Sequence, residues 1–461
     1  MMKTRIEKDS MGDIEVPADA LYSAQTQRAV NNFKISGLTL PEGFIKALAL
    51  VKYCAAQANL KLDNIEADKA KAIQDAALTI YDGRWLDQFP VDVFQTGSGT
   101  SSNMNANEVI ANLARRESNI DIHPNDDVNR GQSSNDVIPT TIAVSSALAV
   151  AEQLLPAAEH LIDSIRHKAG QLSHVVKTGR THLMDAMPLT MAQELESWAQ
   201  QLQLSVDQIK QLQPALQRLS QGGTAIGTGI NAPQGFAEAF NDALSDFTEL
   251  SFTAHDCLFA GIAGQETSLL LSGHLNTLAA TLMKISNDLR WMNSGPLAGL
   301  GEISLTALQP GSSIMPGKVN PVIPEAVTMV VAQVSGNHST ITTAAQAGNF
   351  QLNVMLPVIA YNLLQSIELL SNSCHALADQ AIADFSVNEE QIEHALAKNP
   401  ILVTALNPVI GYNKAADIAK RAYKEKRAII DVAEEMTDLS RQRLSELLDP
   451  KKLTQGGLSD D

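Results

Sequence analysis

Cysteine is scarce in this sequence, and its scarcity excludes several kinds of site. The 461 residues contain three cysteines, Cys54, Cys257 and Cys374, which lie far apart and form no C-x-x-C pair. This pattern excludes a disulfide framework and gives no sign of an iron–sulfur or cysteine-ligated zinc site. We therefore expect a chain that holds no metal and works in a reducing cytoplasm.

Histidine does not indicate a metal site either. Of the ten histidines, several lie on stretches with a helical pattern, as His160, His167 and His274 do. A lone histidine on a helix is usually structural or exposed. None of these three is expected to bind a metal.

Positive charge and long apolar runs are also in short supply. Lys and Arg number 34 against 51 Asp and Glu, which leaves a formal net charge of -17. Such a chain offers no basic stripe to nucleic acid or to an anionic membrane surface. The opening residues MMKTRIEKDS contain no apolar signal region, and no stretch approaches the roughly 20 apolar residues that a membrane span requires. We expect neither nucleic acid nor membrane as a partner, and no export.

Aromatic residues make up only 4% of the chain while hydrophobic residues reach 44%, so the core is expected to be mainly aliphatic. Aliphatic residues recur at alternating spacings of three and four, which is typical of amphipathic helices that pack at a shallow angle. Helices this long and apolar usually need more cover than one subunit supplies, so the pattern favours a homo-oligomeric bundle over a monomeric one. The four series are Leu148, Ala151, Leu155, Ala158, Ile162 and Ile165; Ala192, Leu195, Ala199, Leu202, Val206 and Ile209; Leu271, Leu275, Leu278, Leu282, Ile285 and Leu289; and Val327, Val331, Val334, Ile341 and Ala345.

Composition divides the chain into three segments. Residues 1–133 are predicted to form an N-terminal helical domain that ends in a polar stretch. Residues 134–353 carry the long helical patterns and are predicted to form a central bundle. Residues 354–461 are more charged and less periodic, as in a small C-terminal helical domain. We therefore expect a mainly α fold with the long helices at its centre.

The run 310–321, PGSSIMPGKVNP, places two hydroxyls, an ammonium and a carboxamide in one loop. Its glycines permit backbone conformations closed to other residues, and its prolines exclude a regular helix or central strand. A helix is predicted over residues 319–346, so Lys318 and Asn320 should lie where free N–H groups and the positive end of the helix dipole gather. A carboxylate is stabilised at such a place. The loop is therefore predicted to bind an anion and take part in catalysis.

Further blocks of polar side chains at short spacing accompany this loop. Together with the loop and Glu325 after it, they resemble the fumarase/aspartase superfamily nearly end to end, and Gly317 matches its class II, iron-independent fumarase branch most closely. The blocks are Thr-Gly-Ser-Gly-Thr at 96–100 followed by Asn103, Asn105, Asn107 and Glu108; His-Pro-Asn-Asp at 123–126; Gln-Ser-Ser-Asn-Asp at 132–136; and Gly-Arg-Thr-His at 179–182.

The resemblance implies a mainly α, three-domain fold in which the central helices of four subunits form one bundle. It implies a homotetramer whose active sites each draw on three chains. The implied activity is that of a fumarate hydratase, a lyase of the tricarboxylic acid cycle that reversibly and stereospecifically hydrates fumarate to L-malate through an aci-carboxylate carbanion. The expected partner is a small dicarboxylate, and no cofactor is expected.

The resemblance also assigns catalytic roles to four residues. Ser312 aligns with the family's catalytic loop serine, which takes a proton from carbon, and Lys318 would bear developing negative charge beside it. His182 is the candidate that activates water in hydration and protonates the departing hydroxyl in dehydration. Glu325 resembles the family's charged partner of that histidine, and in a first helical turn it would also stabilise its own helix.

Mainly neutral donors complete the expected substrate site, since they suit carboxylate oxygens. Taken alone, the tract 132–136 is better explained as a turn and helix cap, because Ser, Asn and Asp are favoured there. A second anion site is expected at His123, Pro124, Asn125 and Asp126, with no role evident from the sequence. The expected substrate-binding residues are Ser98, Gly99, Thr100, Ser133, Ser134, Asn135, Thr181, Ser313, Val319 and Asn320.

Two other functions stay open at this point. Aspartases of the superfamily expel ammonia by the same carbon chemistry, and they typically have Thr where this chain has Ser134 and often Ala where it has Gly317. A non-catalytic relative, of the kind reused as a lens protein, would be indicated by the loss of a site residue. Ser134 and Gly317 favour fumarase over aspartase, and the presence of all the expected catalytic residues favours an enzyme over a non-catalytic relative.

Overall fold

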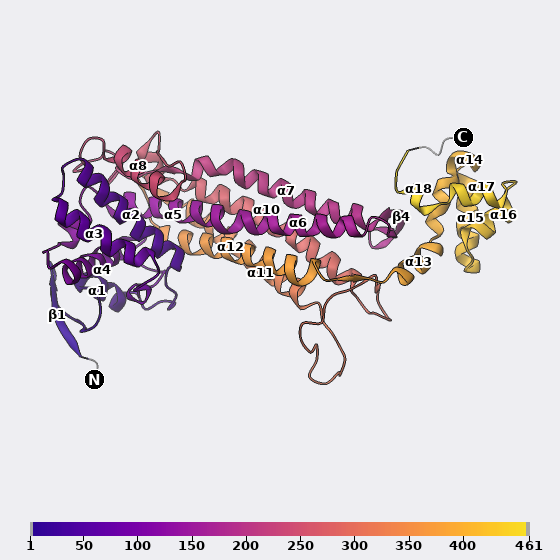
Figure 1. Ribbon diagram of the computed structural model, residues 1–461, viewed down its shortest axis with the longest axis horizontal. Coiled ribbons are helices and arrows are strands. Elements are labelled where there is room, and N and C mark those ends of the chain that lie inside the picture. The colour runs from indigo at the N-terminus through magenta and orange to yellow at the C-terminus, as the bar shows by residue number, and fades with distance from the viewer. Residues whose placement is uncertain (1–2, 458–461) are drawn as a thin grey trace. The chain divides into compact units, whose positions relative to one another are not determined.

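The computed structural model describes residues 3–457, which are mainly α-helical (Figure 1). Its contacts divide the chain into two compact units. Unit 1 runs through Pro156 and also takes in Ser205–Ala279 and Val330–Ser371. Unit 2 takes in Ala157–Leu204, Ala280–Met329 and the chain from Asn372 onward. The expected three-segment division stays a prediction, and residues 1–2 and 458–461 of its outer segments lie outside the described residues.

Unit 1 is built around α2, a 20-residue helix (Glu42–Lys61) whose buried side chains lie on most of its circumference. It packs against α3, α5 and α8, and Figure 1 shows α2, α3 and α4 close together. A β-hairpin precedes these helices. The elements are β1 (Thr4–Asp9), β2 (Gly12–Pro17), α1 (Ala24–Asn32), α3 (Ala67–Tyr81), η1 (Leu86–Gln88), α4 (Thr100–Ser118), η2 (Pro124–Val128), α5 (Ser134–Ala149), η3 (Val150–Leu154), β5 (Arg218–Leu219), α8 (Phe236–Thr248), β6 (Thr253–Ala254), α9 (Leu258–Ala263), β8 (Gly348–Asn349) and β9 (Leu352–Asn353).

The expected long helices are present. Leu195, Ala199, Leu202, Val206 and Ile209 of the second series are buried, as is every member of the series from 271 to 289. Aliphatic periodicity therefore predicted both the helices and their inward faces. The long helices are α6 (Leu155–Gln171), α7 (Met191–Leu216), α10 (Glu266–Met292), α11 (Val322–Ala345) and α12 (Leu356–Leu377).

The first predicted series is wrong in its middle. Ala151 and Leu155 are only half-buried, whereas Val150 and Leu154 are buried. The reason is η3, a single π-helical turn between α5 and α6. Each π turn closes one residue later than an α turn, so the inward face shifts by one position along the sequence.

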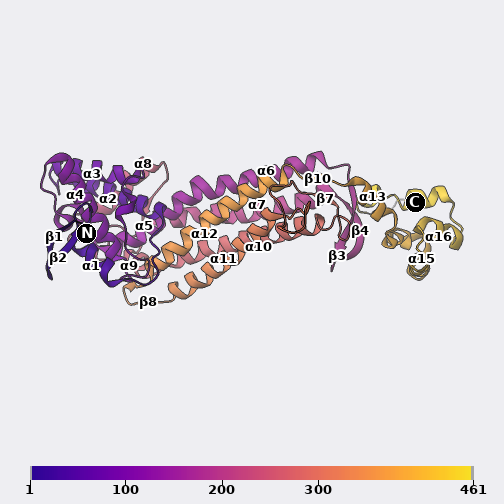
Figure 2. The same ribbon diagram turned by 90° about the horizontal axis from the view of Figure 1, so that it is seen from below.

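Unit 2 combines parts of the long helices with two small sheets and a cluster of short helices. β3 and β4 form an antiparallel hairpin, and β7 pairs with β10, beside which it lies in Figure 2. A small core that includes Leu406, Ile418, Val432 and Leu444 holds the last helices together. The elements are β3 (Val176–Thr181), β4 (Met184–Thr190), β7 (Ile303–Ser304), η4 (Ala378–Ile382), β10 (Ser386–Val387), α13 (Glu389–Ala397), η5 (Pro400–Leu406), α14 (Asn407–Ile410), α15 (Tyr412–Glu425), α16 (Ile429–Met436), α17 (Arg441–Leu447) and α18 (Pro450–Leu453).

One helix in the described chain is long and apolar enough to cross a membrane. It is the continuous run Ser134–Gln171, with a mean hydropathy of 1.4 over its most apolar window. The expectation that no stretch approaches this length was wrong, because the most apolar window of this helix contains at most two charged residues. Since 72% of that window is buried within the protein, it has the character of a core helix.

Candidate active site

The loop 310–321 is closed at its base by one backbone and one side-chain hydrogen bond. The Gly311 N–H donates to the Lys318 carbonyl oxygen at 2.9 Å, and the Asn320 side-chain amide donates to the Gly311 carbonyl oxygen at 2.8 Å. A Cβ at position 311 would lie 2.4 Å from that Lys318 oxygen, so glycine is required there. We call these three residues the loop neck. The following helix begins at Val322 and not at residue 319, because the neck and Pro321 occupy the positions before it.

Ser312 lies just inside the loop neck and is half-buried. Its Oγ accepts hydrogen bonds from the backbone N–H groups of Ile314 at 3.2 Å and Met315 at 3.1 Å. N–H groups aimed at a hydroxyl oxygen stabilise negative charge on it. Ser313, next in the chain, is exposed. The loop thus holds one serine with its oxygen in a backbone donor pair and a second that faces outward.

A pocket of about 750 Å³ lies between the loop, the start of α11 and the end of α10. Lys318, Asn320 and Glu325 all line it, so the structure brings these three predicted residues together. Arg290 and Trp291 of α10 form another part of the wall. Arg290 was not expected from the sequence, where nothing distinguishes it from other basic residues of the chain. Its guanidinium adds a second positive charge to the pocket beside that of Lys318.

His182 lies at the tip of the hairpin formed by β3 and β4. Thr181 pairs with Met184, so His182 and Leu183 are the two residues of the turn. Both have positive φ, 55° and 60°, which is the backbone of the tight turns that usually contain Asn-Gly. For a β-hairpin turn made of His and Leu this conformation is strained. The fold therefore holds His182 in an uncommon backbone conformation, exposed at the end of a short ribbon.

A buried ion network anchors this hairpin. Lys177 of β3 is 1% exposed at its side chain and pairs with Glu302 at 2.8 Å and with Glu194 at 2.5 Å. Arg180, two residues before the turn, pairs with the other oxygen of Glu302 at 2.5 Å. Burial alone would raise the pKa of Glu302, but the Arg180 hydrogen bond and the Lys177 charge outweigh it and hold that pKa below its usual value. Sequence patterns did not indicate a role for Glu302, since nothing near it in the chain points to its partners.

Replacing Glu302 with glutamine is expected to lower the free energy of unfolding by about 3 kcal/mol, because Arg180 and Lys177 lose the charge that compensates their burial. The wild-type carboxylate has a depressed folded-state pKa, so its contribution is fully present above the usual value of 4.5 and is lost as pH falls through the folded value. The stability difference between wild type and variant should therefore be constant near neutral pH and shrink in acid. Denaturant unfolding at a series of pH values measures it.

The matched control is Glu446→Gln, which removes an exposed carboxylate 3.5 Å from Arg443. That change should alter stability by less than about 1 kcal/mol. A Glu302→Gln protein as stable as the control, or a difference that persists unchanged in acid, would contradict the role given to the network.

The block at 96–100 forms the turn before α4 in unit 1. Gly97 is required because a Cβ there would lie 1.8 Å from the Val354 carbonyl oxygen. Gly99 is the N-cap residue of α4, and the hydroxyls of Ser98 and Thr100 lie 2.8 Å apart. The structure thus brings the predicted residues 98–100 together at a helix N-terminus, where anions are favoured.

The block at 132–136 begins α5, also in unit 1. Ser133 is the N-cap residue: its Oγ accepts from the Asn135 N–H at 3.2 Å, and its own N–H donates to Asp136 at 2.8 Å. The helix-cap interpretation is therefore correct for Ser133. The other Asp136 oxygen accepts from the N–H groups of Gly222 at 3.1 Å and Thr224 at 2.9 Å. Ser134 and Asn135 are half-buried beside this cap.

Asp136 and Lys52 are buried titratable groups near this helix start. Burial raises the pKa of Asp136 to about 6, although N–H donors favour its charged form. Burial lowers the pKa of Lys52 to about 7. The Lys52 ammonium donates to Asn129 and Gln132, each at 3.0 Å. These contacts fix the residues that lead into the predicted substrate-binding tract.

The predicted second anion site is an exposed turn in unit 1. His123 caps η2: its Nδ1 accepts from the N–H groups of Asn125 at 3.3 Å and Asp126 at 3.1 Å. Asp127, buried behind the turn, accepts the His123 N–H at 2.7 Å and pairs with Lys69 at 3.0 Å. Residues 123–126 therefore form one local structure with Pro124 in its first turn.

Within unit 2, the predicted residues fall into two groups. Ser312, Lys318 and Glu325 belong to the loop and the start of α11, and His182 belongs to the hairpin. Among residues 3–457, no hydrogen bond or ion pair joins His182 to Glu325. The expected histidine–carboxylate pair is therefore not formed by these two side chains within one copy of the chain.

Comparisons with known proteins give consistent results. The family described as Lyase matches residues 12–336, and the one described as Fumarase C C-terminus matches residues 402–455. The chain is 62% identical to "Fumarate hydratase class II 2" of Pseudomonas aeruginosa, covering 99% of this chain and 100% of that protein. It is 58% identical to "Fumarate hydratase class II" of Xylella fastidiosa, covering 98% and 96%. The crystal structure of recombinant class II fumarase from Schistosoma mansoni matches with a TM-score of 0.95 at 40% identity, covering 98% and 99%.

Proposed function

The chain belongs to the lyase family, in its class II fumarate hydratase branch, and we propose that Ser312 is the base that takes a proton from carbon as L-malate becomes fumarate. The chain is a hydro-lyase for a small dicarboxylate. The observation that carries the assignment to Ser312 is its Oγ, which accepts two backbone N–H groups inside a loop closed by its own neck.

Dehydration of L-malate breaks a carbon–hydrogen bond and then a carbon–oxygen bond on the neighbouring carbon. Ser312, as an alkoxide, takes the proton, and the electron pair moves into the adjacent carboxylate to give an aci-carboxylate carbanion. Lys318, which lines a surface pocket together with Ser312, and Asn320 stabilise the added negative charge. The electron pair then forms the double bond as hydroxide leaves with a proton from an acid. Hydration is the reverse, so each group returns its proton.

His182 is the acid that protonates the departing hydroxyl, and in hydration it activates the water. Thr181 lies beside it and contacts substrate or water. A carboxylate against the imidazole would favour its charged form and fix its orientation, which is the role given to Glu325. The strained turn at the tip of β3 and β4 presents His182 outward from its own chain.

Helix N-termini bind the substrate carboxylates. In this role, Ser98 and Thr100 contribute hydroxyls at the start of α4, and Ser134 and Asn135 contribute polar groups at the start of α5. Ser133 acts mainly through its cap, which sets the first turn of α5. Gly99, Ser313 and Val319 complete the set of substrate contacts, and residues 123–126 form the second anion site.

The active site is completed by other copies of the chain in a homotetramer. Among residues 3–457, His182 and Glu325 form no hydrogen bond or ion pair with each other, and a contact between chains would supply the expected pairing. The hairpin tip also exposes Leu183 and Met184 by 65% and 69%, and Met329 of α11 by 68%, as residues covered by a partner would be. The chain is proposed to work in the cytoplasm.

The activity is tested by ultraviolet absorbance of the purified protein in chelator, without added cofactor. Absorbance should grow with L-malate, as the conjugated double bond of fumarate forms, and stay flat with L-aspartate in a parallel cell. An increase in absorbance with L-aspartate alone would make the chain an aspartate ammonia-lyase, the alternative within the superfamily. Unchanged absorbance with both L-malate and L-aspartate would contradict both activities.

A further inference from the structure

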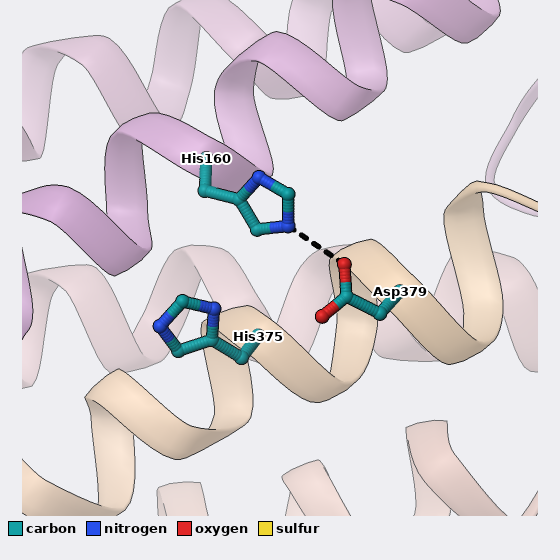
Figure 3. A group of neighbouring side chains, drawn as sticks. All are labelled: His160, His375 and Asp379. Carbon is teal, nitrogen blue, oxygen red and sulfur yellow. Dashed lines mark hydrogen bonds and ion pairs between the residues drawn. The ribbon is translucent and has the colours of Figure 1, made fainter.

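Three metal-binding side chains meet on the surface of unit 2. His160 comes from α6, His375 from the last turn of α12, and Asp379 from η4 (Figure 3). One ligand atom from each lies within 4.8 Å of the others. His160 Nε2 is 2.6 Å from an Asp379 oxygen, and the two imidazole rings are 5.5 Å apart. None of the three belongs to the residues proposed for dicarboxylate chemistry.

The helices hold these side chains in fixed positions. His375 and Asp379 are four residues apart, so they project from neighbouring turns on the same face. Lys168 of α6 donates to the Ala383 carbonyl oxygen at 3.0 Å and lies 4.5 Å from the centre of the Phe385 ring. These contacts fasten α6 to the segment that carries Asp379. A site built on helices is more precisely placed than one built on loops.

Two imidazole nitrogens and a carboxylate oxygen form a donor set typical of Zn²⁺ and related transition metals. Mg²⁺ and Ca²⁺ prefer oxygen ligands throughout and are disfavoured here. We propose that His160, His375 and Asp379 bind one divalent transition-metal ion of the Zn²⁺ class, with solvent in the remaining position.

The three side chains need to move only a short distance to bind the ion. Metal–ligand distances of about 2.0–2.2 Å place ligand atoms roughly 3.4 Å apart in a tetrahedron. The three ligand atoms lie within 4.8 Å of one another, and all three residues are exposed. Rotation of their side chains can therefore bring the ligand atoms to the distances that a bound ion requires. The net charge of -17 favours any cation at the surface.

A simple ion pair between His160 and Asp379 would account for only two of the three side chains. His375 makes no hydrogen bond among the residues that the structure describes, and yet its ring lies against that of His160. In the same residues, no lysine or arginine pairs with Asp379. The second imidazole therefore distinguishes a metal site from the ion pair.

The test uses the full chain without a histidine tag, stripped with chelator and then titrated with Zn²⁺ by calorimetry. One ion per chain is expected to bind. His375→Ala should weaken Zn²⁺ binding by at least about tenfold, because even residues that only support a ligand change affinity by 10–100-fold. Bound Co²⁺ should give visible ligand-field absorption in the wild type that the variant lacks.

The matched control is His174→Ala, which removes another exposed histidine of unit 2, 3.4 Å from Glu389. It should bind Zn²⁺ like the wild type. Both variants should unfold at the wild-type temperature in chelator and turn over L-malate normally, since neither touches the dicarboxylate site. Absence of Zn²⁺ binding by the wild type, or equal affinity in wild type and His375→Ala, would overturn the proposal.

Discussion

Replacing Ser312 with alanine is expected to lower kcat for the dehydration of L-malate by roughly 10³-fold, because a positioned general base contributes that order of rate. KM should change little, since Ser312 is assigned to proton transfer and not to holding the carboxylates. The loop neck is formed by Gly311, Lys318 and Asn320 without the Ser312 hydroxyl, so the variant should fold normally. Initial rates from fumarate absorbance, together with a thermal melt, measure both effects.

The neighbouring serine is the matched comparison. Ser313→Ala removes the outward-facing hydroxyl assigned to the substrate carboxylate, so it should raise KM more than it lowers kcat. If Ser312→Ala were active and Ser313→Ala inactive, Ser313 and not Ser312 would be the base. A folded Ser312→Ala enzyme with near-normal kcat would remove Ser312 from the base role altogether.

Two inactive variants are expected to restore each other when they share a tetramer. His182→Asn and Ser312→Ala each inactivate their own chains. If each site takes the histidine from one chain and the loop from another, random mixing in equal amounts leaves roughly one quarter of the sites with both groups intact. Co-expression with two different tags, purification through both, and the L-malate assay measure the recovered activity.

The control pair is Ser312→Ala with Lys318→Ala, because both changes lie in one loop. Each site takes its loop from one chain, so every site would carry either Ser312→Ala or Lys318→Ala. No activity should therefore return. Equal recovery in the two mixtures, or none in either, would contradict sites shared between chains. Full activity in a verified monomer would contradict them as well.

The sequence predicted the long helices because burial along them follows a simple period. Aliphatic residues at spacings of three and four in α7 and α10 lie where the period places them. The same rule failed between Val150 and Leu155, where a π turn adds a residue without any change in composition. Periodicity detects a helix but not an irregular turn inside it, because the side chains on both sides of the turn stay apolar.

Local chemistry in the candidate site was visible in the sequence, whereas long-range chemistry was not. The loop 310–321 carries its glycines, hydroxyls and ammonium within a dozen residues. Glu302 lies more than a hundred residues from Lys177 and Arg180, and only the fold brings the three together. His160 and Asp379 are separated by 219 positions, so each looks like an ordinary exposed residue in the sequence. Such pairs depend on how helices pack, which no short motif records.

The loop neck has a consequence for engineering. Gly311 and Lys318 are joined through their backbones and Asn320 secures the junction, so the ends of the loop stay fixed whatever side chains lie between them. Gly317 has a φ of 81° and should stay glycine, so residues 313–316 form the exchangeable cassette on this constant frame. A library that varies this cassette while keeping the frame and Ser312 would explore new substrates without rebuilding the helices beneath.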